Sequence, residues 1–263
     1  MLVPGGLNAV HHSGTFYANI IISANTPNFD LHNAVISAGW NGVSQTNIVC
    51  TINSGISVGA NNVSYSGFYS HGFPVGSLIK LINNGIIVGC GGTPGALKSG
   101  DGVGAGQYGN AGFGGGNALL ISYNISIDNT NGYIYGGGGG GGSGAAGVDY
   151  GGAGGWGRGY TYSTLVASAC LGNPGQYDPS YCPTPAQPGT LFGSNGDGSI
   201  CTYGGGAGGN GGDYAGTGGA GGTGGATPAS GGTGGAPGTA VVGNSYITWL
   251  GGNNTTHILG AIT

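Results

Sequence analysis

Between residues 204 and 238 the chain repeats a triplet, one variable residue followed by two glycines, in three separate runs. Each run keeps its own frame, set by Ala207, Asn210 and Asp213, then Ala220, Thr223 and Ala226, then Thr233 and Ala236. A left-handed polyproline II helix has three residues per turn and rises about 3.1 Å per residue. The pattern therefore predicts three antiparallel polyglycine II rods, each roughly 28 Å long.

Such rods are not stable alone. This helix forms no internal hydrogen bonds, so each N–H and C=O must bond to a neighbouring chain or to water. Fixing a backbone costs about 1–2 kcal/mol per residue, while a net hydrogen bond returns about 0.5–1.5 kcal/mol. We therefore expect a stack of many rods bracketed by apolar modules. The alternative, a flexible glycine linker, does not explain the period, its resets or the interspersed aromatic residues.

Composition supports one unusual domain type and excludes several functions. Glycine makes up 69 of 263 residues, charged residues only 4%, and the formal net charge is −4. With three Lys and Arg in all, the chain is suited neither to nucleic acid nor to an anionic membrane surface. Fifteen tyrosines on a weakly charged chain suit recognition of proteins or sugars.

The N-terminus lacks the charged and apolar regions of a signal peptide. Ile20–Ile22 is too short an apolar run to span a bilayer. We therefore expect neither Sec-dependent secretion nor membrane insertion.

The first part of the chain has the pattern of an ordinary small module. Strands are expected at 16–23, 47–53, 56–59, 77–83 and 86–89, with a short helix at 31–38 capped by Asn28 or Asp30 and ended by Gly39. The predicted fold class is mainly β and irregular: a strand-rich N-terminal module with one short helix (1–88), then a polyglycine II sandwich with interspersed β-hairpins (89–263). The second domain includes an insertion at 156–203 and a closing strand region at 241–263.

An internal repeat links the two predicted domains. The phrase Ile52–Gly59 matches Ile82–Gly89, and it returns with an insertion at Ile127–Gly136. Each copy has an apolar segment, a turn at glycine and a second apolar segment, which predicts three hairpins. The second and third copies run into glycine tracts, so we expect these hairpins to form apolar layers that support the rods.

Catalytic and metal-binding patterns are absent from the sequence. The seven aspartates are scattered without a spaced pair, and the glycine tracts match neither a phosphate loop nor a dinucleotide fingerprint. The histidines lack ligand spacing, and an odd number of cysteines without a C-x-x-C pair argues against zinc. We predict no enzyme, no cofactor and no metal.

The insertion at 156–203 is the strongest candidate binding segment. It is rich in aromatic residues and proline, and long loops in compact domains are usually functional. The candidate contact residues are Trp156, Arg158, Tyr160, Tyr162, Tyr177, Asp178, Tyr181, Phe192 and Tyr203. A disulfide among Cys170, Cys182 and Cys201 would rigidify it. The alternative is a loop that folds down as a cap over the rod ends.

Short connectors between rods are the second candidate. Tyr108, Phe113, Tyr150 and Tyr214 lie where rods are expected to turn. If successive rods alternate in direction, alternate connectors gather at one end of a rigid scaffold, where binding residues are expected.

These features resemble the glycine-rich receptor-binding domains of bacteriophage tail proteins, including the adhesins at the tips of T-even-type long tail fibres. The resemblance covers 81–263, and its most specific parts are 82–92, 117–142, the triplet region, 243–249 and 259–262. It implies a polyglycine II sandwich whose distal loops contact an outer-membrane protein or a surface glycan. Residues 1–80 resemble more the strand-rich module of siphophage tail-tip proteins.

The resulting hypothesis is a receptor-binding protein of a phage tail, without enzymatic activity, assembled in the host cytoplasm. Its expected partners are a host surface receptor and another tail or fibre protein. Two alternatives stay open: a structural decoration of the virion, and an ice-binding protein, because flat polyglycine II sandwiches resemble those of some antifreeze proteins.

Overall fold

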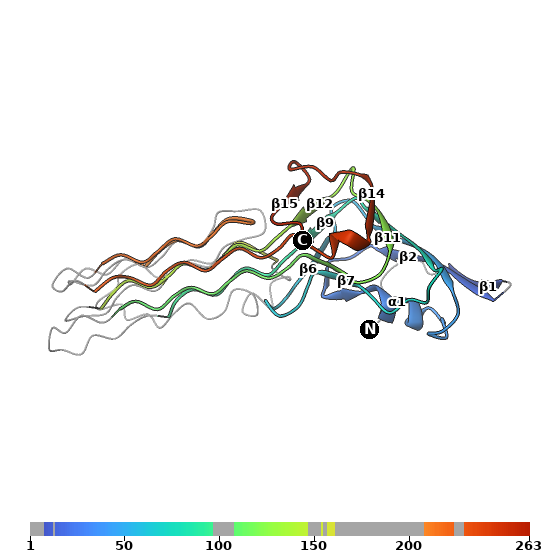
Figure 1. Ribbon diagram of the computed structural model, residues 1–263, viewed down its shortest axis with the longest axis horizontal. Coiled ribbons are helices and arrows are strands. Elements are labelled where there is room, and N and C mark those ends of the chain that lie inside the picture. Colours follow the sequence, from blue (N-terminus) through green and yellow to red (C-terminus); the bar gives the residue numbers. More distant parts are fainter. Residues whose placement is uncertain are drawn as a thin grey trace.

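Three sheets wind around one core in the body of the molecule, and long glycine rods extend from one side of that body (Figure 1). The computed structural model describes residues 8–12, 14–96, 108–146, 154, 157–160, 208–223 and 229–263. Within these residues strands dominate, which confirms the predicted mainly β class.

The chain visits the three sheets in turn. Sheet A has the order β1-β2-β5-β8-β11-β14, sheet B β15-β12-β9-β6-β3, and sheet C β13-β10-β7-β4. From β2 onward, successive strands follow the sequence A, B, C and then A again, and all their pairings are parallel. The body is therefore a three-sided coil, and among the described strands only β1 pairs antiparallel, with β2.

The strands of sheet A are β1 (Asn8–His12), β2 (Thr15–Ile22), β5 (Thr46–Ile52), β8 (Leu78–Asn83), β11 (Ile125–Asp128) and β14 (Ile247–Gly251). Those of sheet B are β3 (Thr26–Pro27), β6 (Ser57–Gly59), β9 (Ile86–Val88), β12 (Tyr133–Tyr135) and β15 (Ile258–Leu259). Those of sheet C are β4 (Phe29–Asp30), β7 (Phe68–Ser70), β10 (Leu119–Ile121) and β13 (Val241–Val242). A short 3₁₀ helix, η1 (Asn244–Tyr246), precedes β14.

The core forms because one face of each strand points inward. Strand β5 alternates buried and half-buried side chains along its whole length. Parallel register stacks the inward residues of successive coils in columns, such as Ile20, Cys50, Leu81 and Ile127, all fully buried. This burial raises the pKa of the Cys50 thiol.

The predicted helix is confirmed as α1 (Leu31–Ser37). Asp30 is its N-cap, and its side chain accepts a hydrogen bond from the Asn33 backbone N–H at 3.2 Å. Gly39 follows with a φ of +103°, a left-handed conformation that favours glycine and that ends the helix.

The predicted hairpins are wrong. In each repeat the two strands lie in different sheets, so the turn between them is a corner of the coil: β5 belongs to sheet A and β6 to sheet B. The register also differs from the sequence repeat by one residue, because Ile52 pairs with Asn83 and not with Ile82. The corner after β5 is two residues longer than the corner after β8, and this difference shifts the alignment.

The rods are insertions at one corner, the corner between sheets B and C. That corner is Asn28 alone in the first coil and 60–67 in the second, but it expands to 89–118 and 136–240 in the next two. Strands from both sides of residue 88 therefore pair within the same sheets. The division into domains 1–88 and 89–263 stays a prediction.

Hydrogen bonds between rods recur at every third residue, as polyglycine II geometry requires. The Gly92 and Gly95 N–H groups donate to Gly138 and Gly141. The rod 136–146 occupies the centre of the rod bundle and contacts six neighbouring segments, which are 89–95, 108–116, 154 with 157–158, 208–215, 216–222 and 229–238. In the part 136–142 of this rod a Cβ would meet a neighbouring backbone at about 2 Å, which explains the seven consecutive glycines there, and the rest of the rod holds only small residues.

Outer rods follow the triplet pattern. The variable residues Asn210, Asp213, Ala220, Thr223 and Thr233 are exposed, while their glycines face neighbouring rods. The rods 216–222 and 229–238 run antiparallel, since Gly218 donates to Gly235 and Gly221 to Gly232. The described parts of the triplet region thus have the predicted phase and direction.

Candidate functional site

The rod bundle has two distinct ends. At the base, Gly89 donates to Tyr135 of β12 and the Tyr160 N–H donates to Gly89, so this end is anchored to sheet B. At the opposite end, the tip, Gly154 donates to Gly95, Gly109 to Ser230 and Ala145 to Gly222. The tip lies far from the body (Figure 1).

Three chain connections start and finish at this tip. They join residue 96 to 108, 146 to 154 and 223 to 229, and the connecting residues lie outside the described part of the chain. The expectation that alternate connectors gather at one end agrees with these endpoints. The connector 213–216 lies instead at the base, because Ala215 donates to Gly136.

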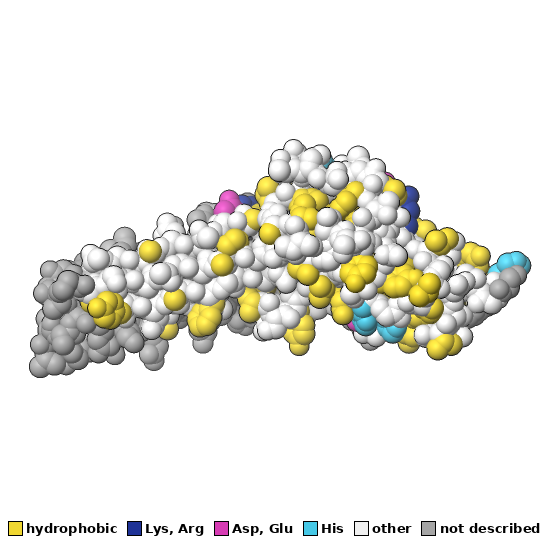
Figure 2. All heavy atoms as spheres, in the orientation of Figure 1, with side chains coloured by type: hydrophobic (Ala, Val, Ile, Leu, Met, Phe, Trp, Pro, Cys, Tyr) yellow, Lys and Arg dark blue, Asp and Glu magenta, His cyan; other side chains and the backbone are white. Residues whose placement is uncertain are grey.

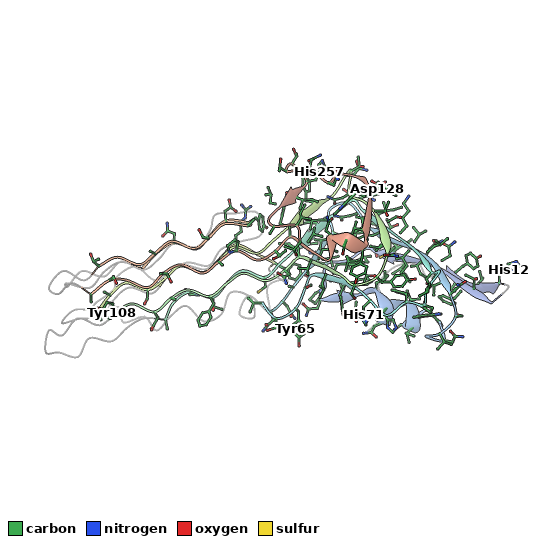
Figure 3. All side chains as sticks on the ribbon, viewed as in Figure 1. His12, Tyr65, His71, Tyr108, Asp128 and His257 are labelled. Carbon is green, nitrogen blue, oxygen red and sulfur yellow. The ribbon has the colours of Figure 1, made fainter. Side chains whose placement is uncertain are left out.

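Tyr108 and Phe113 lie exposed on the rod that returns from the tip. Their exposed fractions are 68% and 63%. Asn110, between them, donates its side-chain amide to the Ala96 carbonyl, so the rod ends are tied together next to these rings. Figure 3 shows Tyr108 near the remote end of the rods.

The other candidates on described residues form a cluster at the base. The Arg158 guanidinium lies 2.6 Å from an Asp213 carboxylate oxygen and 4.3 Å from the Tyr214 ring centroid. Tyr214 in turn stacks on Tyr135 at 4.7 Å. Desolvation raises the pKa of Tyr214, and the nearby Arg158 charge opposes this rise. The cluster fastens the rods to sheet B.

Tyr160 is not available to a receptor, contrary to the sequence-based expectation. Its exposed fraction is 1%, and it packs against Val88. A Cβ at Gly59 would lie within 2.1 Å of the Tyr160 ring, so a glycine in the second coil makes room for it. The sequence placed Tyr160 in the aromatic insertion 156–203, and only the fold shows that it is buried.

The remaining sequence candidates lie outside the described residues and stay predictions: Tyr150, Trp156, Tyr162, Tyr177, Asp178, Tyr181, Phe192, Tyr203, and the cysteines Cys170, Cys182 and Cys201. Cys90, which was not among the cysteines predicted to pair, is disulfide-bonded, whereas Cys50 is a free thiol.

A group that sequence reasoning missed lies on the body beside the rods. Tyr65 is 58% exposed in the corner loop 60–67. The His71 ring stacks on Tyr69 at 4.2 Å, and its Nε2 lies 3.2 Å from an Asp30 carboxylate oxygen. Tyr65, Tyr69 and His71 lie in the second coil and Asp30 in the first, so no local sequence pattern reveals the contact of His71 with Asp30.

Within the described ranges, no three His, Cys, Asp or Glu side chains are placed to hold a metal ion. Among the helices in those same ranges, none has the length and apolar character needed to cross a membrane.

The base cluster gives a modest stability prediction. Arg158→Gln removes one ion pair and one cation–π contact, and we expect a loss of about 1 kcal/mol, because the Asp213 side chain is mostly exposed. Chemical denaturation of Arg158→Gln, Asp213→Asn and the double variant measures the coupling. The coupling energy between Arg158 and Asp213 should decrease in about 1 M salt. A coupling energy that does not depend on salt would contradict an ionic contribution.

Comparison with known proteins agrees with this architecture. The family model for the phage tail fibre adhesin Gp38 matches residues 17–263. Among solved structures, the gp37–gp38 adhesin tip complex of the bacteriophage S16 long tail fibre is similar, with a TM-score of 0.59 and 26% identity over 93% of this chain and 82% of that chain. A comparison with curated proteins gave no significant match.

The family match corrects one expectation. It includes the strands from residue 17 onward, whereas the sequence-based resemblance to these adhesins was confined to 81–263. The early strands lack the glycine signature, and only the coil that they share with later strands reveals the relationship. The chain therefore belongs to the Gp38 family of phage tail fibre adhesins, receptor-binding proteins of the virion tail.

Proposed function

We propose that this adhesin binds its host receptor, an outer-membrane protein or a surface glycan, through the connections at the rod tip. The observation that carries the proposal is that the described ends of three connections, residues 96 and 108, 146 and 154, and 223 and 229, lie at the end of the rods that is remote from the body. The rods are rigid because almost every described glycine in them faces a neighbouring backbone. Loops on a rigid scaffold can vary in sequence without loss of the fold.

The geometry favours the tip over the insertion as the main determinant of specificity. The undescribed segment 161–207 runs from Tyr160 at the base to residue 208 near the tip, where Gly209 donates to Gly142, whereas the other three connections have both endpoints at the tip. In this proposal the insertion has a secondary role, and the adhesin has no catalytic activity.

Exchange of loops between this chain and a related adhesin of different host range tests the proposal. We expect exchange of 97–107, 147–153 and 224–228 to lower binding of the purified chain to its original strain at least 100-fold, with an unchanged melting temperature. Exchange of 161–203 alone should change binding less than tenfold. Undiminished binding after the tip exchange would overturn the proposal, and a loss confined to the 161–203 exchange would place specificity in the insertion.

We also propose that the body attaches to another fibre protein, after assembly in the host cytoplasm. The similar S16 protein is in a complex with gp37. In this chain, the corner between sheets C and A is away from the corner where the rods leave, and it exposes Val43 and Val75. Exposed apolar residues at adjacent loops suit a protein contact. Co-purification with the cognate fibre protein should be lost in a Val43→Asp/Val75→Asp variant and retained in the tip-exchanged chain.

A further inference from the structure

Aromatic side chains are exposed along one flank of the molecule, from the rod tip to the body. The members are Tyr108, Phe113 and Tyr65, each more than half exposed, followed by the Tyr69, His71 and Asp30 group. We call this set the aromatic flank. Figure 3 shows Tyr108, Tyr65 and His71 along the same lower side, and Figure 2 shows apolar side chains along that side.

The contact between rod and body places Phe113 on the face of the rod that meets the loop of Tyr65. A Cβ at Gly116 would lie 3.1 Å from the Val63 Cα, so the loop that carries Tyr65 lies against the base of this rod. Phe113 is three residues before Gly116, one full turn, and therefore points in the same direction. Tyr108 is five residues before Phe113, so its ring lies on the neighbouring exposed row of the same rod. The rise per residue places Phe113 about 15 Å from Tyr108 along the rod axis and about 9 Å from Gly116.

Folding does not require large rings at these rod positions. The rods are held by backbone hydrogen bonds, and the other exposed side chains on neighbouring rod surfaces are small, such as Ala111, Thr233 and Ala236. A single exposed apolar residue is ordinary. Two exposed rings on one rod of small residues, together with Tyr65 on the adjacent loop of the body, are typical of a contact surface, where aromatic residues are enriched.

The chemistry of the flank fits a neutral polysaccharide. Asp30 is its only formally charged acid, and that carboxylate already accepts from the Asn33 amide and faces His71. Arg158 and Asp213, the charged residues on described rods, contact each other at the base. Aromatic faces pack against the C–H faces of sugar rings, and planar polar groups such as Asn110, His71 and Asp30 can exchange hydrogen bonds with hydroxyls. Spaced rings suit an extended chain of repeating units.

We propose that the aromatic flank binds a neutral surface polysaccharide of the host along its length, in addition to the receptor contact at the tip. The inference rests on the proposed function, because it assigns a second contact to the same attachment event. A polysaccharide aligned along the rods would hold the adhesin near the cell surface while the tip reaches its receptor.

The probe is the polysaccharide released by mild acid from the lipopolysaccharide of the strain to which the full chain binds. Calorimetry or biolayer interferometry should detect binding by the wild type and at least a tenfold loss in Phe113→Ala/Tyr65→Ala. Tyr17→Ala is the matched control, since it removes a partly exposed ring from sheet A, and it should bind as the wild type does. Melting temperatures of all variants should agree within a few degrees.

Two further arms separate this inference from the proposed function. The tip-exchanged chain should still bind the polysaccharide, although it no longer binds the original cells tightly. Periodate treatment of cells should abolish the difference between the wild type and the flank variant. Absence of polysaccharide binding by a wild-type chain that binds cells would overturn the flank proposal alone. If the binding defect of the flank variant persists on periodate-treated cells but is absent on protease-treated cells, the flank contacts a protein. That outcome would also overturn the flank proposal.

Discussion

Replacement of Gly139 by alanine is expected to abolish packing of the rods. Gly139 lies in the central rod, and a Cβ there would lie 1.9 Å from the Gly235 carbonyl oxygen and 2.5 Å from its carbon. Both atoms belong to a neighbouring backbone that is itself hydrogen-bonded to the central rod, so neither can move without loss of other bonds. We expect destabilisation of at least about 4 kcal/mol, in the range that only severe core changes reach.

Limited proteolysis and differential scanning calorimetry measure this effect. The Gly139→Ala rods should be cleaved rapidly, or the variant should be insoluble, while the wild type resists. Gly114→Ala is the matched control, because a Cβ there meets only the Ala236 carbonyl oxygen at 3.4 Å, an ordinary contact. Its melting temperature should lie within about 2 °C of that of the wild type, because the expected change in the free energy of unfolding is less than about 1 kcal/mol. If the Gly139→Ala and Gly114→Ala variants resist proteolysis equally well, the central rod is not close-packed.

Asn83→Ala is expected to produce the second large loss of stability. The Asn83 side chain is fully buried at the corner between sheets A and B. Its amide donates to Asn129 Oδ1 at 2.7 Å and to the Tyr133 carbonyl at 3.2 Å, and its Oδ1 accepts from the Gly85 N–H at 3.1 Å. Each buried group left without a partner costs about 1–3 kcal/mol, so we expect the free energy of unfolding to fall by about 3–5 kcal/mol.

The sequence repeat itself supplies the control for this variant. Asn53 holds the same place in the first copy of the repeated phrase, but its side chain is exposed. Asn53→Ala should change the free energy of unfolding by less than about 0.5 kcal/mol. Guanidinium denaturation of both variants gives the comparison. Similar losses for the two variants would contradict the one-residue shift in register between the coils.

The candidate site was only partly predictable from sequence. The glycine tracts placed Tyr108 and Phe113 at expected turns between rods. Both rings are exposed, but Phe113 lies on the rod itself, where its N–H donates to Thr93. The aromatic composition of the insertion 156–203 was misleading for Tyr160, since the base of the rods is covered by residues from distant coils. The contact between His71 and Asp30 gave no signal at all, because their proximity depends on the stacking of coils.

The triplets and the glycine tract determined by themselves that this chain forms close-packed rods, because only glycine tolerates a neighbouring backbone on several sides. The alternating apolar segments likewise determined that most of the body is strand. Tertiary structure alone decided that the repeats are corners of a coil and not hairpins, because a strand–turn–strand pattern is compatible with either pairing. It also decided which rod ends are buried against sheet B and which form the tip, since that depends on contacts between residues far apart in the sequence.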